Sequence, residues 1–275
     1  PPRSTQGVSS AASDVYKRQI GALGFPDLNV IVGVLVGGAF AAGGAGSLNM
    51  AYEHKLDRAM GRTKNRPVAE NRISTLSATI WGVLLNILSF VVLYTLTNII
   101  AALLALLGTA LYFFLYTMIL KTRTTQNIVI GGIAGCMPPL VGYAAASGTI
   151  DLTAAWMFLI VFFWTPPHFW ALALVRVDEY KRVGIPMLPV VAGKDATRRQ
   201  ILIYTILLVP VSFAPLALGI AGYLYAICAI AMGGGLLFLA YRIITRRDDH
   251  AARRGIFISH LGRFARRKRN PKRRK

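Results

Sequence analysis

Long apolar stretches separated by polar segments make up most of the chain. Seven of them approach the length of about 20 residues that a helix needs to cross the hydrocarbon core of a bilayer. They cover residues 28–48, 75–95, 98–120, 128–147, 153–175, 200–218 and 221–243. Pro138 and Pro139 lie inside the fourth stretch and predict a kink there. The pattern predicts an all-α polytopic membrane protein.

The composition agrees with a membrane location and narrows the function classes. Of the 275 residues, 55% are hydrophobic and 15% are charged, whereas charged residues make up about a quarter of an ordinary soluble domain. This balance excludes an intrinsically disordered chain. The two cysteines, Cys136 and Cys228, lie 92 positions apart within apolar stretches, so they form neither a disulfide framework nor a CxxC metal site.

The positive charge is concentrated in particular segments. The net charge is +20, but nine of the last fifteen residues are Lys or Arg. Upstream of this tail, the polar segments 49–74 and 176–199 carry six Lys or Arg each, and the alternate connections carry none. Because positive loops stay inside, both long loops and the C-terminus are predicted to be cytoplasmic. The tail is isolated from any recognition fold, so the charge does not indicate a nucleic-acid partner.

Both ends of the chain differ in character from the apolar region. Residues 14–19 read DVYKRQ, which is similar to the translation of a transposon sequencing adapter, so residues 1–19 are interpreted as a non-native segment. Residues 260–275 form a basic tail with two interpretations, a frameshifted end and a native polybasic segment that touches anionic lipid. We therefore expect a single domain, residues 20–259, truncated at both ends.

The first long loop carries acidic and basic side chains in a regular pattern. If the first helix continues past Leu48, then Asn49, Glu53 and Asp57 lie four residues apart, each turned about 40° from the last, and form one oxygen-bearing stripe. Mg²⁺ prefers oxygen ligands and shares its shell with substrate phosphates. Taken alone, the loop has an equally good interpretation as a solvated turn.

The second long loop repeats this chemistry and weakens that interpretation. Asp178 and Glu179 come at the end of an apolar stretch and are followed by Tyr180, Lys181 and Arg182. Two acidic clusters with basic neighbours, predicted on the same membrane face, suit a site in which metal ions hold a diphosphate between them.

At this point residues 28–259 resemble a known family, the protoheme IX farnesyltransferases, a branch of the intramembrane UbiA-type prenyltransferases. The motifs are NxxxExxxD with RTKNRP in residues 49–67, LKTRTTQNIVIGGIAGCMPPLVGY in 120–143, WTPPHFWALAL in 164–174 and DEYKRVGIPMLPVV in 178–191. The first motif alone is typical of the whole superfamily, and the others indicate the haem-farnesylating branch.

The resemblance implies a fold, a reaction and a location. The fold would be a UbiA-type helical bundle with about seven of the family's nine transmembrane helices present. The reaction would transfer a farnesyl group from farnesyl diphosphate to the vinyl group of protoheme IX (haem b), with Mg²⁺ as cofactor, giving haem O and diphosphate. The location would be the bacterial cytoplasmic (inner) membrane, with haem A synthase or the terminal oxidase assembly as protein partners.

The resemblance also assigns residues. Asn49, Glu53 and Asp57 match the first acidic motif and Asp178 with Glu179 the second, which makes these five catalytic and Glu53, Asp57 and Asp178 metal ligands. Glu53 and Glu179 stand where Asp is usual. The resemblance assigns binding of the diphosphate to seven cations: Arg62, Lys64, Arg66, Lys121, Arg123, Lys181 and Arg182. Tyr180, which can donate to a phosphate oxygen, and His168 are further candidates for substrate binding.

Several alternatives stay open. His168 is either a haem-side residue or a packing histidine, and Trp164, Phe169 and Trp170 either contact substrate or pack between helices. A prenyltransferase of an aromatic quinone precursor, such as 4-hydroxybenzoate, would keep both acidic motifs. A transporter is the alternative from another class, but transporters place their charges near the bilayer midplane, whereas these cluster at one face.

Overall fold

The computed structural model describes residues 26–247, and every regular element in this range is a helix. The expected non-native segment 1–19 and basic tail 260–275 lie outside the described residues. The elements are α2 (Leu28–Tyr52), α3 (His54–Ala59), α4 (Thr75–Leu96), α5 (Ile99–Ala110), the π-helix η1 (Leu111–Leu120), α6 (Asn127–Gly135), α7 (Met137–Ser147), α8 (Leu152–Leu174), α9 (Val177–Arg182), α10 (Leu188–Val191), α11 (Gly193–Ala217) and α12 (Tyr223–Arg246).

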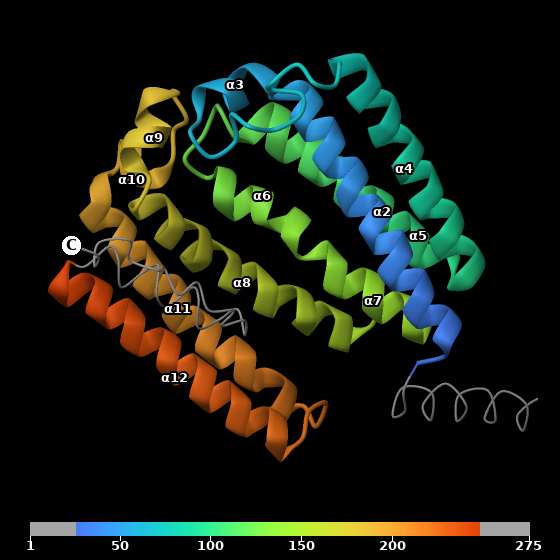
Figure 1. The fold of residues 1–275 in the computed structure, drawn as a ribbon. Helices are drawn as coiled ribbons and strands as arrows, with labels where there is room; N and C mark the ends of the chain where they lie inside the picture. The colour runs from blue at the N-terminus through green and yellow to red at the C-terminus, as the bar shows by residue number, and fades with distance from the viewer. Residues whose placement is uncertain (1–25, 248–275) are drawn as a thin grey trace, which may run out of the picture.

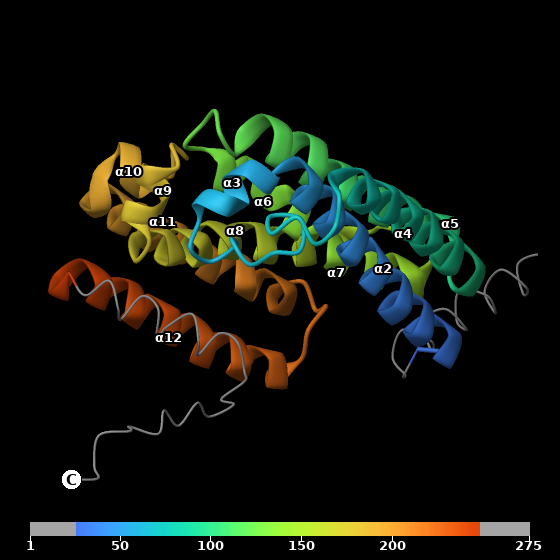
Figure 2. The same ribbon diagram turned by 45° about the horizontal axis from the view of Figure 1, so that its top comes forward.

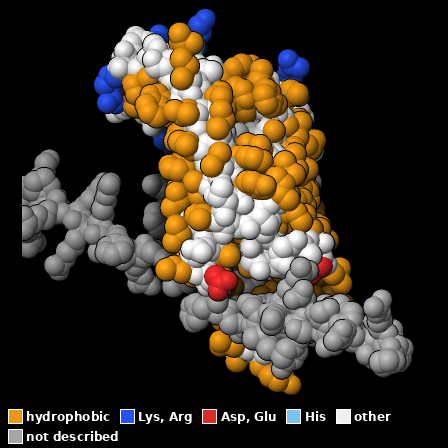
Figure 3. All heavy atoms as spheres, turned by 90° about the vertical axis from the view of Figure 1, so that its right-hand side faces the viewer, with side chains coloured by type: hydrophobic (Ala, Val, Ile, Leu, Met, Phe, Trp, Pro, Cys, Tyr) orange, Lys and Arg blue, Asp and Glu red, His pale blue; other side chains and the backbone are white. Residues whose placement is uncertain are grey.

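The seven predicted spans are confirmed within residues 26–247. Counting α5 with η1 and α6 with α7 as single spans, seven helical segments of 21 to 25 residues are long and apolar enough to cross a bilayer. Their outer surfaces are apolar: Leu76 on α4 and Leu224 on α12 are 68% and 78% exposed. Figure 3 shows apolar side chains covering much of one face of the molecule, with Lys and Arg at one end. The chain is therefore an integral membrane protein.

The spans form one bundle in which each span packs on the next one along the chain (Figure 1). Helix α2 packs most extensively on α4 and also contacts α5, η1 and α7, while α8 lies between α6 and α11, and α12 packs on α11. The short helices α3, α9 and α10 all lie at the same end of the bundle, as Figures 1 and 2 both show. We call this the basic end, because α3 and α9 carry Lys and Arg side chains.

Small residues bring α2 and α4 into close contact. A Cβ atom added to Gly37 would lie 2.6 Å from Leu93 Cγ, and one added to Gly44 would lie 2.8 Å from the carbonyl oxygen of Gly82. Glycine is favoured at both positions because a side chain would overlap Leu93 at the first and the Gly82 carbonyl at the second. This packing fixes the register of α2, which carries the acidic stripe at its end.

Two spans are irregular where they approach the site. The fourth breaks at Cys136, between α6 and α7, and α7 has proline in its first turn, so the kink predicted from Pro138 and Pro139 is confirmed. The third changes from an α-helix to a π-helix at Leu111. Helix α8 stays continuous through Pro166 and Pro167.

Candidate active site

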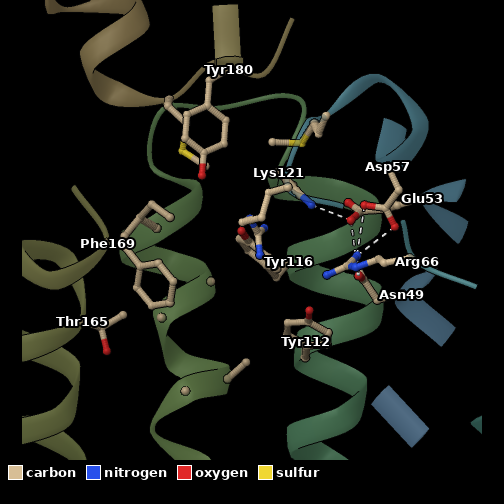
Figure 4. Close-up of a pocket in the computed structure, with 18 residues that line it drawn as sticks. Asn49, Glu53, Asp57, Arg66, Tyr112, Tyr116, Lys121, Thr165, Phe169 and Tyr180 are labelled. Carbon is tan, nitrogen blue, oxygen red and sulfur yellow. Dashed lines mark hydrogen bonds and ion pairs between the residues drawn. The ribbon is translucent and has the colours of Figure 1, made fainter. Parts of the chain in front are cut away.

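A cavity of about 320 Å³ opens at the basic end of the bundle, between α2, η1, α6, α8 and α9 (Figure 4). One side holds the charged residues Glu53, Asp57, Arg66 and Lys121 with the polar Asn49, and Phe169 and Thr165 lie on the opposite side (Figure 4). The other lining residues are Met60, Arg62, Tyr112, Tyr116, Ile128, Gly131, Gly132, Ala134, Gly135, Tyr180 and Met187. The cavity thus combines a charged end with apolar and aromatic walls.

Asn49, Glu53 and Asp57 form the predicted stripe. Helices α2 and α3 are separated by Glu53. Its amide nonetheless donates to Asn49 O and the Asp57 amide donates to Glu53 O, both at 2.8 Å, so the i to i−4 pattern continues. All three residues are buried, with exposures of 3%, 4% and 2%. The spacing therefore predicts their common direction, and the surrounding helices remove them from solvent.

Each buried carboxylate is paired with a cation. Lys121 Nζ donates to Glu53 Oε2 at 2.5 Å, and Arg66 Nη1 donates to both oxygens of Asp57, at 3.0 and 2.8 Å. Asn49 joins the pairs, because its Nδ2 donates to Glu53 Oε2 at 2.9 Å and its Oδ1 accepts from Arg66 Nη1 at 3.4 Å. Pairing and hydrogen bonding offset the cost of burying these charges.

The π-helix η1 explains how Lys121 reaches this cluster. In an α-helix, which turns about 100° per residue, Tyr112 and Lys121 would point in opposite directions, since nine steps make about 900°. In a π-helix, with bonds from i to i+5, nine residues make about two full turns and both side chains share one face. The Lys121 amide bonds to Tyr116 O at 2.9 Å in this pattern.

Thr117 connects η1 to the stripe. It is 1% exposed, its hydroxyl donates to Tyr112 O at 2.9 Å, and its Oγ1 accepts from Asn49 Nδ2 at 3.2 Å. Tyr112 and Tyr116 stack with ring centroids 5.8 Å apart and line the cavity beside the charges. Sequence reasoning missed these three residues. In an α-helix Thr117 would be turned about 140° and Lys121 about 180° from Tyr112, and no periodic signal marks the change to a π-helix.

The second acidic loop meets the first over the cavity. Glu179 Oε1 accepts a hydrogen bond from the Arg62 amide at 3.3 Å. Tyr180 lines the cavity from α9, and burial raises the pKa of its phenol above the ordinary value. Tyr180 therefore remains a neutral hydrogen-bonding group at physiological pH.

The structure does not bring every predicted residue to the cavity. Five are exposed and lie outside its lining: Lys64, Arg123, Asp178, Lys181 and Arg182. His168 is half-buried outside the lining and stacks on Trp164 with ring centroids 4.3 Å apart. Phe169 lines the cavity, whereas Trp170 is 2% exposed in the apolar core around α8.

The donor set fits a hard divalent cation bound together with a substrate. Within residues 26–247 no group of three or more His, Cys, Asp or Glu side chains is placed to hold a metal ion. Glu53, Asp57 and the Asn49 amide oxygen are nonetheless hard oxygen donors, and Mg²⁺ commonly takes only one or two carboxylates and completes its shell with water and phosphate oxygens. The arrangement can bind an anionic, metal-bound head group with an apolar chain.

The sequence is similar to that of known prenyltransferases. The UbiA prenyltransferase family model matches residues 19–261. A protoheme IX farnesyltransferase of Chloroflexus aurantiacus is 47% identical over 234 residues, which cover 85% of this chain and 40% of that protein. One from Rhodopseudomonas palustris (strain BisB5) is 50% identical over 218 residues, covering 78% and 69%. The chain thus spans less than half of the first relative and about two thirds of the second.

A solved structure shares the fold. The structure of a UbiA homolog from Archaeoglobus fulgidus bound to DMAPP and Mg²⁺ aligns with a TM-score of 0.66 at 16% identity, over 86% of this chain and 85% of that one. At this identity the likeness concerns the arrangement of helices. The arrangement of the helices is therefore a recurrent fold.

Proposed function

We propose that this chain, which belongs to the UbiA prenyltransferase family, transfers a farnesyl group from farnesyl diphosphate to the vinyl group of protoheme IX, giving haem O and diphosphate. Two relatives at 47% and 50% identity carry the name protoheme IX farnesyltransferase. The observation that carries the proposal is the cavity itself, in which buried carboxylates and cations at one end adjoin apolar walls. Such a cavity suits a diphosphate joined to a hydrocarbon chain.

We assign the diphosphate to the charged end. Glu53 and Asp57, with the Asn49 amide oxygen, would hold Mg²⁺, and the second acidic motif, Asp178 and Glu179, would approach from α9. Mg²⁺, when bound, stabilises the negative charge of the leaving diphosphate as a Lewis acid. Support for Mg²⁺ comes from the donor set and from the metal in the Archaeoglobus homolog.

The chain's own cations assist departure of the diphosphate. Arg66 and Lys121 lie beside the carboxylates, and Arg62 lines the same cavity. As the bond between C1 of the farnesyl group and oxygen breaks, its electron pair stays on the diphosphate, and these cations stabilise the developing charge. The farnesyl fragment is left as an allylic cation.

The walls keep this cation away from bulk water until the acceptor reacts. Tyr112, Tyr116 and Phe169 surround the cavity with aromatic surface. The haem vinyl group supplies the electron pair of the new carbon–carbon bond, which moves the positive charge to the ring-attached carbon. One water molecule then adds there with loss of a proton, which balances the reaction and yields the hydroxyethylfarnesyl substituent.

We propose the bacterial inner membrane as the location, with the basic end in the cytoplasm. The loops at that end carry the Lys and Arg residues, and cytoplasmic loops of membrane proteins are enriched in both. In this orientation a water-soluble diphosphate product leaves toward the cytoplasm.

The test is to incubate membranes containing the protein with farnesyl diphosphate, Mg²⁺ and haem b, and to measure haem O by chromatography and mass spectrometry. Asp57→Asn should abolish product. Glu70→Gln, an exposed acid of the same loop that pairs with Arg72, is the matched control and should retain activity. Product from 4-hydroxybenzoate in place of haem b would support the quinone-precursor alternative and refute the haem assignment.

A further inference from the structure

We propose that two glycines of α2, Gly46 and Gly38, set the length of the prenyl chain that the enzyme accepts. They line a second cavity, of about 410 Å³, which runs along α2 from Gly46 to Val34 and is bounded by α5, α6 and α7. This cavity shares Tyr112, Ala134 and Gly135 with the active-site cavity. The inference rests on the proposed function, because it takes the diphosphate to lie at the charged end.

The chemistry of the second cavity suits hydrocarbon. Of the fifteen described residues that line it, nine are Gly or Ala, and none is Lys, Arg, His, Asp or Glu. A porphyrin with two carboxylate substituents would leave those charges unpaired in such surroundings, at a large cost. An isoprenyl chain carries no polar group and loses nothing on entering. The cavity therefore fits the donor chain better than the acceptor.

Neither glycine is required by helix packing. Among residues 26–247, a Cβ atom added to Gly38 or Gly46 meets no heavy atom within 4 Å, whereas Gly37 and Gly44 on the same helix press against α4. Both residues are half-buried and border the cavity. The missing side chains thus leave space inside the cavity, and a larger residue at either position would fill that space.

The positions of Gly46 and Gly38 along α2 match the length of a farnesyl group. With a rise of 1.5 Å per residue, Gly46 lies about 4.5 Å and Gly38 about 16 Å from the level of Asn49. Three bonds of an extended chain span about 3.3–3.6 Å, so an isoprene unit of four bonds spans about 4.5 Å and a farnesyl group about 14 Å. The first unit would pass Gly46, and the third would end next to Gly38.

Substitution at the two positions should therefore have different results. Gly38→Leu blocks the place of the third unit, so kcat/KM for farnesyl diphosphate should fall at least tenfold and that for geranyl diphosphate less than threefold. Gly46→Leu blocks the first unit and should lower both. Val34→Ala, at the far end of the cavity, should raise the relative activity with the 20-carbon donor. Gly43→Leu is the matched control, because Gly43 is exposed and outside both cavities.

The experiment measures both transfer to haem b and binding, the latter as thermal stabilisation of the purified protein by geranyl, farnesyl or geranylgeranyl diphosphate with Mg²⁺. Binding of the prenyl diphosphate does not depend on the acceptor. If the wild type makes no haem O but Gly38→Leu still binds farnesyl diphosphate less well relative to geranyl diphosphate, this inference is upheld and the proposed acceptor is refuted. Equal losses for geranyl and farnesyl diphosphate in Gly38→Leu, or the same change in Gly43→Leu, would overturn it. Gly38→Ala and Gly38→Val give a graded series of smaller side chains that should fold as the wild type does.

Discussion

Lys121 offers the sharpest test of the diphosphate site. Its Nζ lies 2.5 Å from Glu53 Oε2, and the two side chains are 15% and 3% exposed. A hydrogen bond to a charged group contributes about 1.5–3 kcal/mol. Since about 1.4 kcal/mol corresponds to a tenfold change in rate, Lys121→Met should lower kcat/KM for farnesyl diphosphate by about 10- to 150-fold.

Two further cations make the comparison decisive. Lys55 is exposed on α3, two residues from Glu53, and does not line the cavity. Lys55→Met should leave kcat/KM within about twofold of the wild type, since surface charges contribute little. Arg123, which the family resemblance assigns to substrate binding, is exposed outside the cavity, so Arg123→Met should cost less than Lys121→Met.

The stability of the same variants separates binding from folding. Lys121→Met leaves the Glu53 carboxylate buried with Asn49 as its remaining hydrogen-bond donor, and breaking a buried ion pair costs about 3–5 kcal/mol. The double variant Glu53→Gln/Lys121→Met removes both charges and should regain most of the thermal stability but none of the activity. The reasoning fails if Lys121→Met keeps kcat/KM within threefold of the wild type. It fails also if Lys55→Met lowers kcat/KM as much as Lys121→Met does.

Three other predictions follow from the same contacts. Gly44→Ala should lower the unfolding temperature in detergent, because the new methyl group overlaps Asn86 and the Gly82 carbonyl at a cost of about 1–3 kcal/mol; Gly43→Ala, with Leu85 at 3.6 Å, should instead gain up to about 1 kcal/mol from helix propensity. Equal unfolding temperatures would contradict the packing argument. Chelation of Mg²⁺ with EDTA should abolish transfer, and added Mg²⁺ should restore it; activity that survives exhaustive chelation would refute a metal role for Glu53 and Asp57. Glu179→Gln should lower kcat/KM more than Asp178→Asn, and the reverse order would show that α9 rotates in the working enzyme.

The spans were predictable because a bilayer imposes one requirement on every crossing helix. The ends predicted for each agree with the structure to within a few residues, except that α11 begins at Gly193 rather than at residue 200. The polar start of α11, which includes Asp195 and Arg198, reads as loop because the apolar pattern begins only later. Hydrophobicity marks the membrane-crossing part of a helix and says nothing about its extension into solvent.

The acidic stripe was predictable for a similarly direct reason, whereas its cationic partners were not. Carboxylates four apart share a helix face at any α-helical position. Arg66 reaches Asp57 from an irregular loop, which is held to α3 by a hydrogen bond from Arg58 Nε to Ala69 O at 2.8 Å, and Lys121 depends on the π-helix. Neither the loop conformation nor the change of helix type has a periodic signature. The sequence therefore named several candidate cations and did not show which of them pair with the carboxylates.

Asp178 and Glu179 are a second case in which the sequence did not determine which side chain faces the site. In the six-residue helix α9, successive side chains are turned by about 100°. Tyr180 lines the cavity and Glu179 contacts the Arg62 amide, so Asp178, about 200° from Tyr180, points elsewhere and is exposed. An acidic pair in the sequence does not reveal which member faces the site, because that depends on where α9 begins. Here it begins at Val177, after Arg176 with φ of −131°, and this start gives Glu179 rather than Asp178 the position beside the first loop.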